Sequence, residues 1–213
     1  MDWVRKIVKR TFGTTVVGLI GAASLVGCNS AAQLPEKPAI DVDVAVDKAF
    51  QQLDSDSSGG LDLKELRSAP GMLFGLDRVD ANKDRTISRD ELAQRLAFWN
   101  ESTQRVFNLE VALTYRGRPV SQADVTFEPE PFLAEWLKPV TGRTDDLGRV
   151  TPRASEDFPG IDKGYYRVKV SGGSPSLPPK FSEDSPAGIE FTDDRPEDEQ
   201  FLLQLRLDAP PRR

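Results

Sequence analysis

The sequence predicts a multidomain α plus β protein, in which a helical pair precedes a seven-stranded or similar antiparallel β-sandwich. Residues 41–101 place apolar side chains at three- and four-residue steps around two acidic loops of equal length, which indicates amphipathic helices. Residues 105–213 instead alternate apolar and polar side chains in short runs between Pro and Gly turns, as half-buried strands do. We therefore expect the helices to give way to strands between residues 101 and 105.

Composition excludes several classes of function. The chain has 213 residues, with 28 Lys and Arg against 34 Asp and Glu, and its net charge is −6. This charge argues against nucleic-acid binding, which requires a basic face to neutralise phosphates. The chain has no His and one Cys. A Ser-His-Asp or Cys-His catalytic group, an imidazole-ligated zinc or haem, an internal disulfide and an iron–sulfur site are therefore excluded.

Residues 1–27 have the features of a targeting segment. Four basic residues and one acidic residue lie in the first ten positions, and an uncharged run rich in Val, Leu, Gly and Ala follows over residues 11–27. A basic start with a short apolar core is typical of a secretory signal. The run is shorter than the span of about 20 residues that a membrane helix needs. Residues 28–40 have no periodic pattern, so we expect a flexible tether there.

The only Cys of the chain stands at the end of this apolar run. The residues Leu25-Val26-Gly27-Cys28 resemble the lipobox of bacterial lipoproteins. The resemblance implies addition of diacylglycerol to Cys28, cleavage before it, and acylation of the new N-terminus with a chain such as palmitate. Several acyl chains attach a protein stably to a bilayer. The alternative is an ordinary signal peptide with an incidental Cys.

The first acidic loop, which we call loop one, spans Asp54–Glu65 and follows a predicted helix over residues 41–53. Calcium takes about six to eight oxygen ligands, so a loop that binds it must wrap around the ion. Gly59 stands where such a loop turns sharply, and Leu61 is expected to point into the core. Ser58 stands where Asp or Asn is usual. The expected ligands are Asp54, Asp56, Ser58, the Gly60 carbonyl, Asp62 through a water, and both oxygens of Glu65.

The second acidic loop, loop two, spans Asp80–Glu91 and repeats the pattern. Ile87 takes the core position and should pair with Leu61. Arg85 occupies the glycine position, where left-handed backbone costs a residue with a Cβ about 1–2 kcal/mol. Its positive charge also lies beside the expected cation, so we expect a weakened site. The expected ligands are Asp80, Asn82, Asp84, the Thr86 carbonyl, Ser88 and Glu91.

Together the two loops and their flanking helices resemble the EF-hand family over residues 41–101. The resemblance implies a pair of calcium sites. Residues 66–79 must hold one exiting and one entering helix of about two turns each, broken at residues 69–71. A further helix is predicted from Ser88 to Glu101. The alternatives are an EF-like fold that has lost calcium, or Asp-rich loops that are only solvated.

The strand pattern begins with a clean alternation over residues 107–115. A second alternation places Phe201, Leu203, Leu205 and Leu207 on one face. Further strands are predicted at residues 123–127, 141–144, 149–153 and 165–170. About seven short strands with Pro and Gly turns are typical of a β-sandwich.

Three segments of this region resemble the transthyretin-like, carboxypeptidase-regulatory-like sandwiches. Gly117–Phe127 follows the pattern GxPVxxAxVxF, Thr144–Arg149 matches the turn TDxxGR, and Pro159–Val170 resembles the strand PG…GxYxVxV. The resemblance covers residues 107–207 and implies a non-catalytic accessory module, because such folds host many functions.

Two insertions depart from that family pattern, and an acidic cluster precedes the last predicted strand. Residues 129–140 suggest one apolar helical turn, in which Phe132 and Trp136 either form an exposed docking patch or cap the edge of the sandwich. Residues 171–186 are rich in Ser and Pro and irregular. The acidic cluster at residues 193–199 either holds a further cation or is a solvated loop.

These features predict a non-enzymatic, calcium-binding lipoprotein of the cell envelope, lipid-anchored to a bacterial membrane on its periplasmic side or at the cell surface. The membrane, through the lipid on Cys28, and an envelope protein or polysaccharide are the expected partners, and no nucleic acid is expected. Extracellular calcium modules bind at about 10⁻⁴–10⁻³ M, which favours structural sites over a sensor. The alternatives are a surface adhesin that binds a glycan or protein through the sandwich loops, and a carboxylate-based envelope hydrolase.

Overall fold

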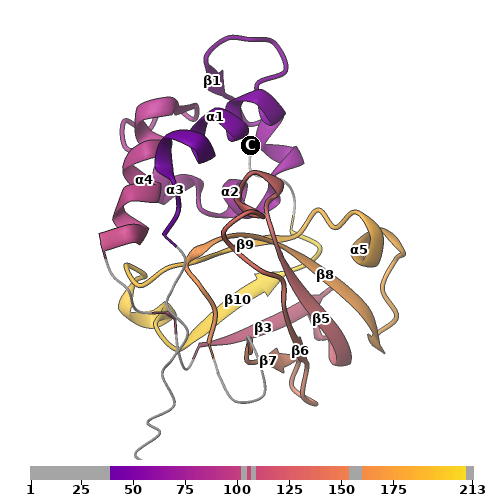
Figure 1. The fold of residues 1–213 in the computed structure, drawn as a ribbon. Helices are drawn as coiled ribbons and strands as arrows, with labels where there is room; N and C mark the ends of the chain where they lie inside the picture. Colours follow the sequence, from indigo (N-terminus) through magenta and orange to yellow (C-terminus); the bar gives the residue numbers. More distant parts are fainter. Residues whose placement is uncertain (1–38, 102–104, 107–108, 154–159, 210–213) are drawn as a thin grey trace, which may run out of the picture. The chain divides into compact units, whose positions relative to one another are not determined.

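The computed structural model describes residues 39–101, 105–106, 109–153 and 160–209. The predicted signal peptide, Cys28, most of the tether and Phe107 lie outside the described residues. The described part contains α-helices, short 3-10 helices (η) and strands in a mixed α and β arrangement. Figure 1 labels the α-helices and most of the strands. The predicted combination of helices with several antiparallel strand pairs is thus confirmed at this coarse level.

Helix α1 spans Val42–Leu53 and lies where the apolar spacing predicts it. It begins after Asp41, whose carboxylate accepts a hydrogen bond from the Val44 backbone N–H at 3.1 Å, as Asp does at a helix N-cap. Val44 lies away from the core and is 40% exposed. The residues that are buried on this helix are Ala45, Val46, Ala49, Phe50 and Leu53.

The link between the two loops is divided into three short pieces. They are η1 (Glu65–Ser68), α2 (Pro70–Phe74) and α3 (Leu76–Val79). The break at Ala69 has extended backbone, with φ −127° and ψ 72°, because the residue before Pro is disfavoured in a helix. The predicted break at residues 69–71 is therefore present, with a second interruption at Gly75. Helix α4 then spans Arg89–Glu101.

The strands form two four-stranded sheets and a two-stranded ribbon. The ribbon pairs β1 (Gly60–Leu61) with β2 (Ile87–Ser88). One large sheet has the order β10-β3-β4, with β7 also paired to β3. The other has the order β6-β5-β8-β9, and its longest pairing joins β5 to β8 (Figure 1). The bounds are β3 Glu110–Tyr115, β4 Arg118–Pro119, β5 Ser121–Pro129, β6 Val140–Arg143, β7 Arg149–Val150, β8 Gly164–Ser174, β9 Gly188–Phe191 and β10 Leu202–Arg206.

The sheets differ from the expected antiparallel seven-stranded arrangement in three ways. Strand β10 pairs with β3 in parallel, from Leu202 opposite Glu110 to Arg206 opposite Thr114. Parallel pairing requires a long crossover, which the chain between these distant segments provides. Strand β9 was not predicted, because all four of its residues are buried and so show no alternation. Phe201 was expected on the buried face of the last strand, but it precedes β10 and is 70% exposed. That expectation was wrong.

The two insertions are partly ordered. In the first, η2 (Pro131–Leu133) buries Phe132 to 1% exposure, so Phe132 belongs to the hydrophobic core and is not an exposed docking residue. Trp136 is half-buried, with the Lys48 ammonium 5.1 Å from the centre of its ring. The second insertion contains α5 (Lys180–Glu183), which buries Phe181.

The helices and the sheets share one continuous hydrophobic core, and residues 34–213 form one compact unit. A Cβ on Gly188 of β9 would lie 2.0 Å from the Pro70 carbonyl carbon, so the α2 backbone lies directly against this strand. Trp99 of α4 packs edge to face on Tyr165 of β8, with ring centroids 4.7 Å apart. The division into a 41–101 domain and a 105–213 domain stays a prediction.

Among the described residues, no helix combines the length and the apolar character that a membrane crossing requires.

Candidate metal centre

The two acidic loops adopt the same backbone conformation. Each has left-handed residues at positions four and six, which are Ser57 and Gly59 in loop one and Lys83 and Arg85 in loop two, with φ of 59°, 82°, 62° and 65°. Left-handed backbone favours glycine. Loop two therefore places an arginine in the conformation that glycine takes in loop one, as the sequence predicts.

The loops are joined through their core positions. Leu61 and Ile87 are paired in the β1–β2 ribbon and are both fully buried, which confirms their predicted pairing. A Cβ on Gly60 would lie 2.5 Å from the Thr86 Cγ2. The small residue at position seven of loop one thus allows loop two to approach closely.

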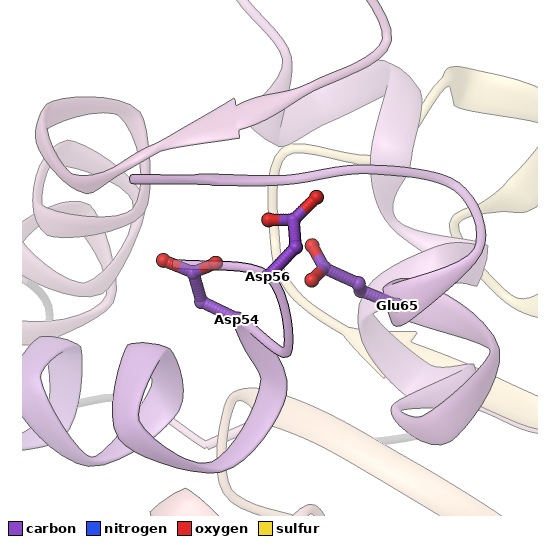
Figure 2. A group of neighbouring side chains, drawn as sticks. All are labelled: Asp54, Asp56 and Glu65. Carbon is purple, nitrogen blue, oxygen red and sulfur yellow. The ribbon is translucent and has the colours of Figure 1, made fainter. Parts of the chain in front are cut away.

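Three acidic side chains of loop one converge on one point. Each of Asp54, Asp56 and Glu65 offers a carboxylate oxygen, and these oxygens lie within 4.8 Å of one another (Figure 2). Asp54 and Asp56 lie in the turn after α1, whereas Glu65 is the first residue of η1. Glu65 is 7% exposed and Asp56 is exposed, so the cluster opens towards solvent on one side.

Backbone N–H groups hold the carboxylates of loop one in place. Asp54 accepts hydrogen bonds from the N–H groups of Ser58 and Gly59, both at 3.0 Å. Glu65 reaches back across the loop and accepts from the N–H of Ser55 at 2.6 Å and of Asp62 at 3.1 Å. These bonds leave lone pairs of the carboxylates available to a cation, because each oxygen can accept more than one contact.

Ser58 also affects its neighbours. Hydrogen bonding by the Ser58 hydroxyl and then by its backbone N–H lowers the pKa of Asp56, which keeps that side chain ionised. The Ser58 Oγ lies 3.0 Å from the Gly60 carbonyl oxygen. The expected ligands at positions five and seven are therefore adjacent.

Asp62 has a structural contact that the sequence analysis did not assign. One of its oxygens accepts hydrogen bonds from the N–H groups of Lys64 and Glu65, at 2.8 Å and 2.9 Å. This contact satisfies N–H groups at the start of η1, which have no partner within the helix. It also orients Glu65, the residue that closes the loop.

Loop two repeats these contacts position by position. Asp80 accepts from the N–H groups of Asp84 at 3.2 Å and Arg85 at 2.8 Å. Glu91 accepts from the N–H of Ala81 at 3.1 Å and of Ser88 at 2.9 Å. In both loops the N–H donors are at positions two, five, six and nine. The two loops therefore hold their first and last carboxylates in the same way.

Glu91 is held as a carboxylate. Burial opposes its ionisation, but hydrogen bonds from the Ser88 N–H, the Ser88 hydroxyl and the Asn82 and Ala81 N–H groups outweigh it and lower its pKa. The Ser88 hydroxyl donates to Glu91 at 2.7 Å. Ser88 and Glu91 thus form the reciprocal pairing of a capping box at the start of α4.

The two loops differ in how closely their carboxylate oxygens approach one another. Within the described residues, Asp54, Asp56 and Glu65 are the one set of three acidic side chains that meets the 4.8 Å criterion. In loop two, Asn82 replaces the carboxylate at position three, and its amide donates to Asp84 at 2.9 Å. Hard oxygen donors suit calcium or magnesium. Both loops carry such donors, and loop one has the more convergent negative charge.

A comparison with protein families supports this geometry for loop one. The EF hand family matches residues 46–69, which contain α1 from Val46 onward, all of loop one and η1. The match does not extend to loop two. No curated protein and no solved structure matches the chain.

An ion-pair network behind loop two was not predicted. Glu190 of β9 is fully buried and accepts hydrogen bonds from the Nε of Arg78 at 2.5 Å and the Nε of Arg95 at 2.7 Å. Arg78 lies in α3, just before loop two, and Arg95 lies in α4, just after it. Since β9 itself shows no sequence periodicity, the available signal was the position of Arg95, which falls on the same face of α4 as Leu92, Leu96 and Trp99.

The acidic cluster at residues 193–199 is divided between the two kinds of surroundings, because Glu197 and Asp198 are exposed, as a solvated loop predicts, whereas Asp193 and Asp194 pair with cations of the protein. Asp194 accepts hydrogen bonds from both Nη atoms of Arg95, at 2.6 Å and 3.0 Å. Burial opposes its ionisation, but the bonds from Arg95 and Thr192 outweigh it and lower the pKa of Asp194 to about 2. Asp193 accepts from the buried Lys163 at 2.5 Å. These two residues are thus anchored to the protein by its own cations.

Proposed function

We propose that the chain is a calcium-binding, membrane-anchored lipoprotein of the cell envelope, whose β part is a non-catalytic interaction or spacer module. The single observation that carries calcium binding is the convergence of Asp54, Asp56 and Glu65 in a loop that matches the EF hand family. Calcium prefers carboxylate and carbonyl oxygens at adaptable distances. The loop-one donors and the Gly60 carbonyl are of this kind.

Calcium in these loops has a structural role in the proposal. Loop two lies between α3 and α4, and both of these helices are tied to the buried Glu190. Large opening of the helices, as in a calcium sensor, would separate Arg78 or Arg95 from that carboxylate. Leaving a buried charge without its partner is strongly unfavourable. The network therefore supports sites that stabilise one conformation.

Membrane attachment and export rest on the sequence of the N-terminal segment. Cys28 and the apolar run before it resemble a lipobox, and Cys28 is the one thiol of the chain. Acyl chains on this residue would anchor the protein, with residues 28–40 as a tether. An exported location also agrees with weak calcium sites that stay filled in calcium-rich surroundings.

A role without catalysis is proposed for the β part because the chain lacks His and no pair of its carboxylates stands in a recognisable catalytic frame. The adhesin alternative, in which this part binds a glycan or protein, gains support from a basic pocket described below. The hydrolase alternative gains no such support.

Calcium titration calorimetry of the full chain tests the central proposal. We expect at least one saturable site in the wild type and loss of that site in Glu65→Gln, because Glu65 closes the loop with its two oxygens. Glu197→Gln is the matched control, since Glu197 is exposed and lies in the β part. Calcium should also raise the melting temperature of the wild type, and by less in Glu65→Gln, in which loop two is the remaining site.

Two outcomes would contradict the calcium proposal. One is a titration of the wild type that shows no saturation at millimolar calcium. The other is a Glu65→Gln protein that binds as the wild type does, because the assigned loop would then not be the site.

A further inference from the structure

A pocket of about 660 Å³ lies between α2, α5, β9 and the ends of β3 and β10. We call it the basic pocket. Four cationic side chains line it, which are Arg67, Arg116, Lys180 and Arg206. Its volume is in the range of pockets that hold a small ligand, about 300–1,000 Å³.

The charge of this pocket is opposite to that of the protein. The chain has a net charge of −6, yet the pocket has four cations against one carboxylate, Asp208. All four cations are exposed. None of the four takes part in the ion pairs of the described residues. A neighbouring hollow that contains Arg78 and Arg195 is instead balanced by Asp77, Asp194 and Glu199.

Aromatic rings position two of the cations. The Arg116 guanidinium lies 5.2 Å from the centre of the Tyr115 ring, and the Lys180 ammonium lies 5.0 Å from the centre of the Phe181 ring. The two rings pack edge to face, with centroids 5.8 Å apart. Cation–ring contacts hold the charged groups near one place. These contacts favour positions of the Arg116 and Lys180 cations beside the paired rings of Tyr115 and Phe181.

The walls of the pocket are apolar and fixed. Pro70, Leu73 and Phe74 of α2 form one wall, and the contact of Pro70 with Gly188 of β9 holds that helix against the sheet. Phe74 and Tyr115 are half-buried. A ligand in this pocket would meet apolar surface and cations together.

The end of β10 favours a compact ligand over an extended peptide. The Leu207 N–H is bonded to the Thr114 carbonyl at 2.9 Å, and the Ala209 N–H to the Arg206 carbonyl at 3.2 Å. The strand thus ends in a turn where it reaches the pocket. A peptide that adds to a sheet edge needs a row of unpaired backbone groups, and this turn interrupts such a row.

We propose that the basic pocket binds a carboxylate-bearing sugar, such as a uronate unit of an acidic polysaccharide. The guanidinium groups of Arg116 and Arg206 match a carboxylate in charge and planar shape. A sugar ring has one face of C–H groups that can contact Tyr115 or Phe74, and hydroxyl groups that can accept from Lys180. This inference rests on the interaction role proposed for the β part and is independent of calcium binding.

The test is a binding titration of the full chain, in detergent, with a short oligomer of glucuronate. A neutral oligomer of glucose with the same length and linkage is the ligand control, and an acidic peptide of equal charge is a second control. For the calcium titrations of these samples, a titration of the sugar alone, without protein, corrects for calcium that the sugar itself binds. We expect saturable binding of the glucuronate oligomer that weakens as salt is raised. The two control ligands should bind at least about tenfold more weakly.

Charge variants locate the site. The double variant Arg116→Gln/Arg206→Gln should lose about tenfold or more in affinity, because both guanidinium groups are removed. The matched control Arg118→Gln/Lys138→Gln removes two exposed cations outside the basic pocket and should bind as the wild type does. Circular dichroism and a melting curve show that each variant is folded.

Several results would overturn the inference. They are absence of saturable glucuronate binding, equal binding of the neutral oligomer, equal or tighter binding of the acidic peptide, and equal losses in the two double variants. Calcium titration of the same samples keeps the proposals apart. Glucuronate binding without a calcium site would refute only the calcium proposal, and a calcium site without glucuronate binding would refute only this inference.

Discussion

Arg85 is the residue at which loop two departs most from loop one. Its φ of 65° is in the left-handed region, where a residue with a Cβ costs about 1–2 kcal/mol. Its N–H still donates to Asp80 at 2.8 Å, so the loop keeps its shape. Arg85 therefore adds backbone strain and a positive charge to loop two.

We predict that Arg85→Gly strengthens calcium binding in loop two by about tenfold, because relief of strain and removal of a like charge together are worth about 1–2 kcal/mol. The measurement is a calcium titration in an Asp54→Ala background that silences loop one. Arg85→Ala is the control, since it removes the charge but keeps the Cβ, and it should give only part of the gain. An unchanged or weaker loop-two site in Arg85→Gly would show that Arg85 causes no strain there, or that loop two does not bind calcium.

At the scale of elements, a buried carboxylate connects α2 to the end of β5. Glu130 is fully buried, and one of its oxygens accepts a hydrogen bond from the Gly71 N–H at 2.7 Å. Its other oxygen has no hydrogen-bond partner among the described residues. Burial and, to a smaller extent, the charge of Glu128 raise the pKa of Glu130 to about 7, against opposing effects of the Gly71 N–H and Arg167.

This pKa predicts the direction of a pH effect on stability. The folded pKa of Glu130 lies above its ordinary value of 4.5, so the folded state favours the protonated form. Stability from this group is complete below pH 4.5 and is lost as pH rises towards 7. Over that interval the loss is on the order of 3 kcal/mol.

Glu130→Gln should therefore be close to the wild type in stability at pH 5 and more stable than it at pH 8. Denaturant unfolding at both pH values measures the difference. Glu190 and Asp194 titrate in both proteins, so their effects cancel in the comparison. A Glu130→Gln protein that shows the same loss of stability between the two pH values would contradict the prediction.

For the whole molecule, the main question is whether the β part folds without the helices. The sequence predicts two separate domains, and on that basis residues 105–213 should fold alone. The structure shows Glu190, fully buried, between Arg78 and Arg95, and both arginines are missing from such a fragment. Breaking a buried ion pair by removing one side costs about 3–5 kcal/mol, which is a large part of the stability of a small domain.

We now expect a fragment of residues 105–213 to lack cooperative thermal unfolding, and addition of a fragment of residues 39–104 to restore it. Circular dichroism in the far and near ultraviolet measures both. Glu190→Gln in the isolated β fragment should recover part of the stability, because it removes the unpaired charge. Cooperative unfolding of the unaltered fragment by itself would support the two-domain division that the sequence predicts.

Local features of the protein follow from sequence alone, since they depend on residues near one another in the chain. Helices α1 and α4, the break at Ala69 and the left-handed Arg85 are all of this kind. The pairing of Leu61 with Ile87 could be predicted because the same loop pattern occurs twice in the sequence. A loop that binds a cation must carry its ligands at fixed spacing. The candidate metal centre could therefore be assigned from the order of its residues.

The remaining features were decided by tertiary structure, because they join segments that are far apart in sequence. Strand β9 is buried on both faces and has no period, and β10 lies parallel to β3 because of a crossover that no local pattern specifies. The partners of Glu190 are about a hundred residues away along the chain. The basic pocket likewise gathers cations from four separate segments. Burial and long-range pairing determine such sites, and neither can be read from the spacing of neighbouring residues.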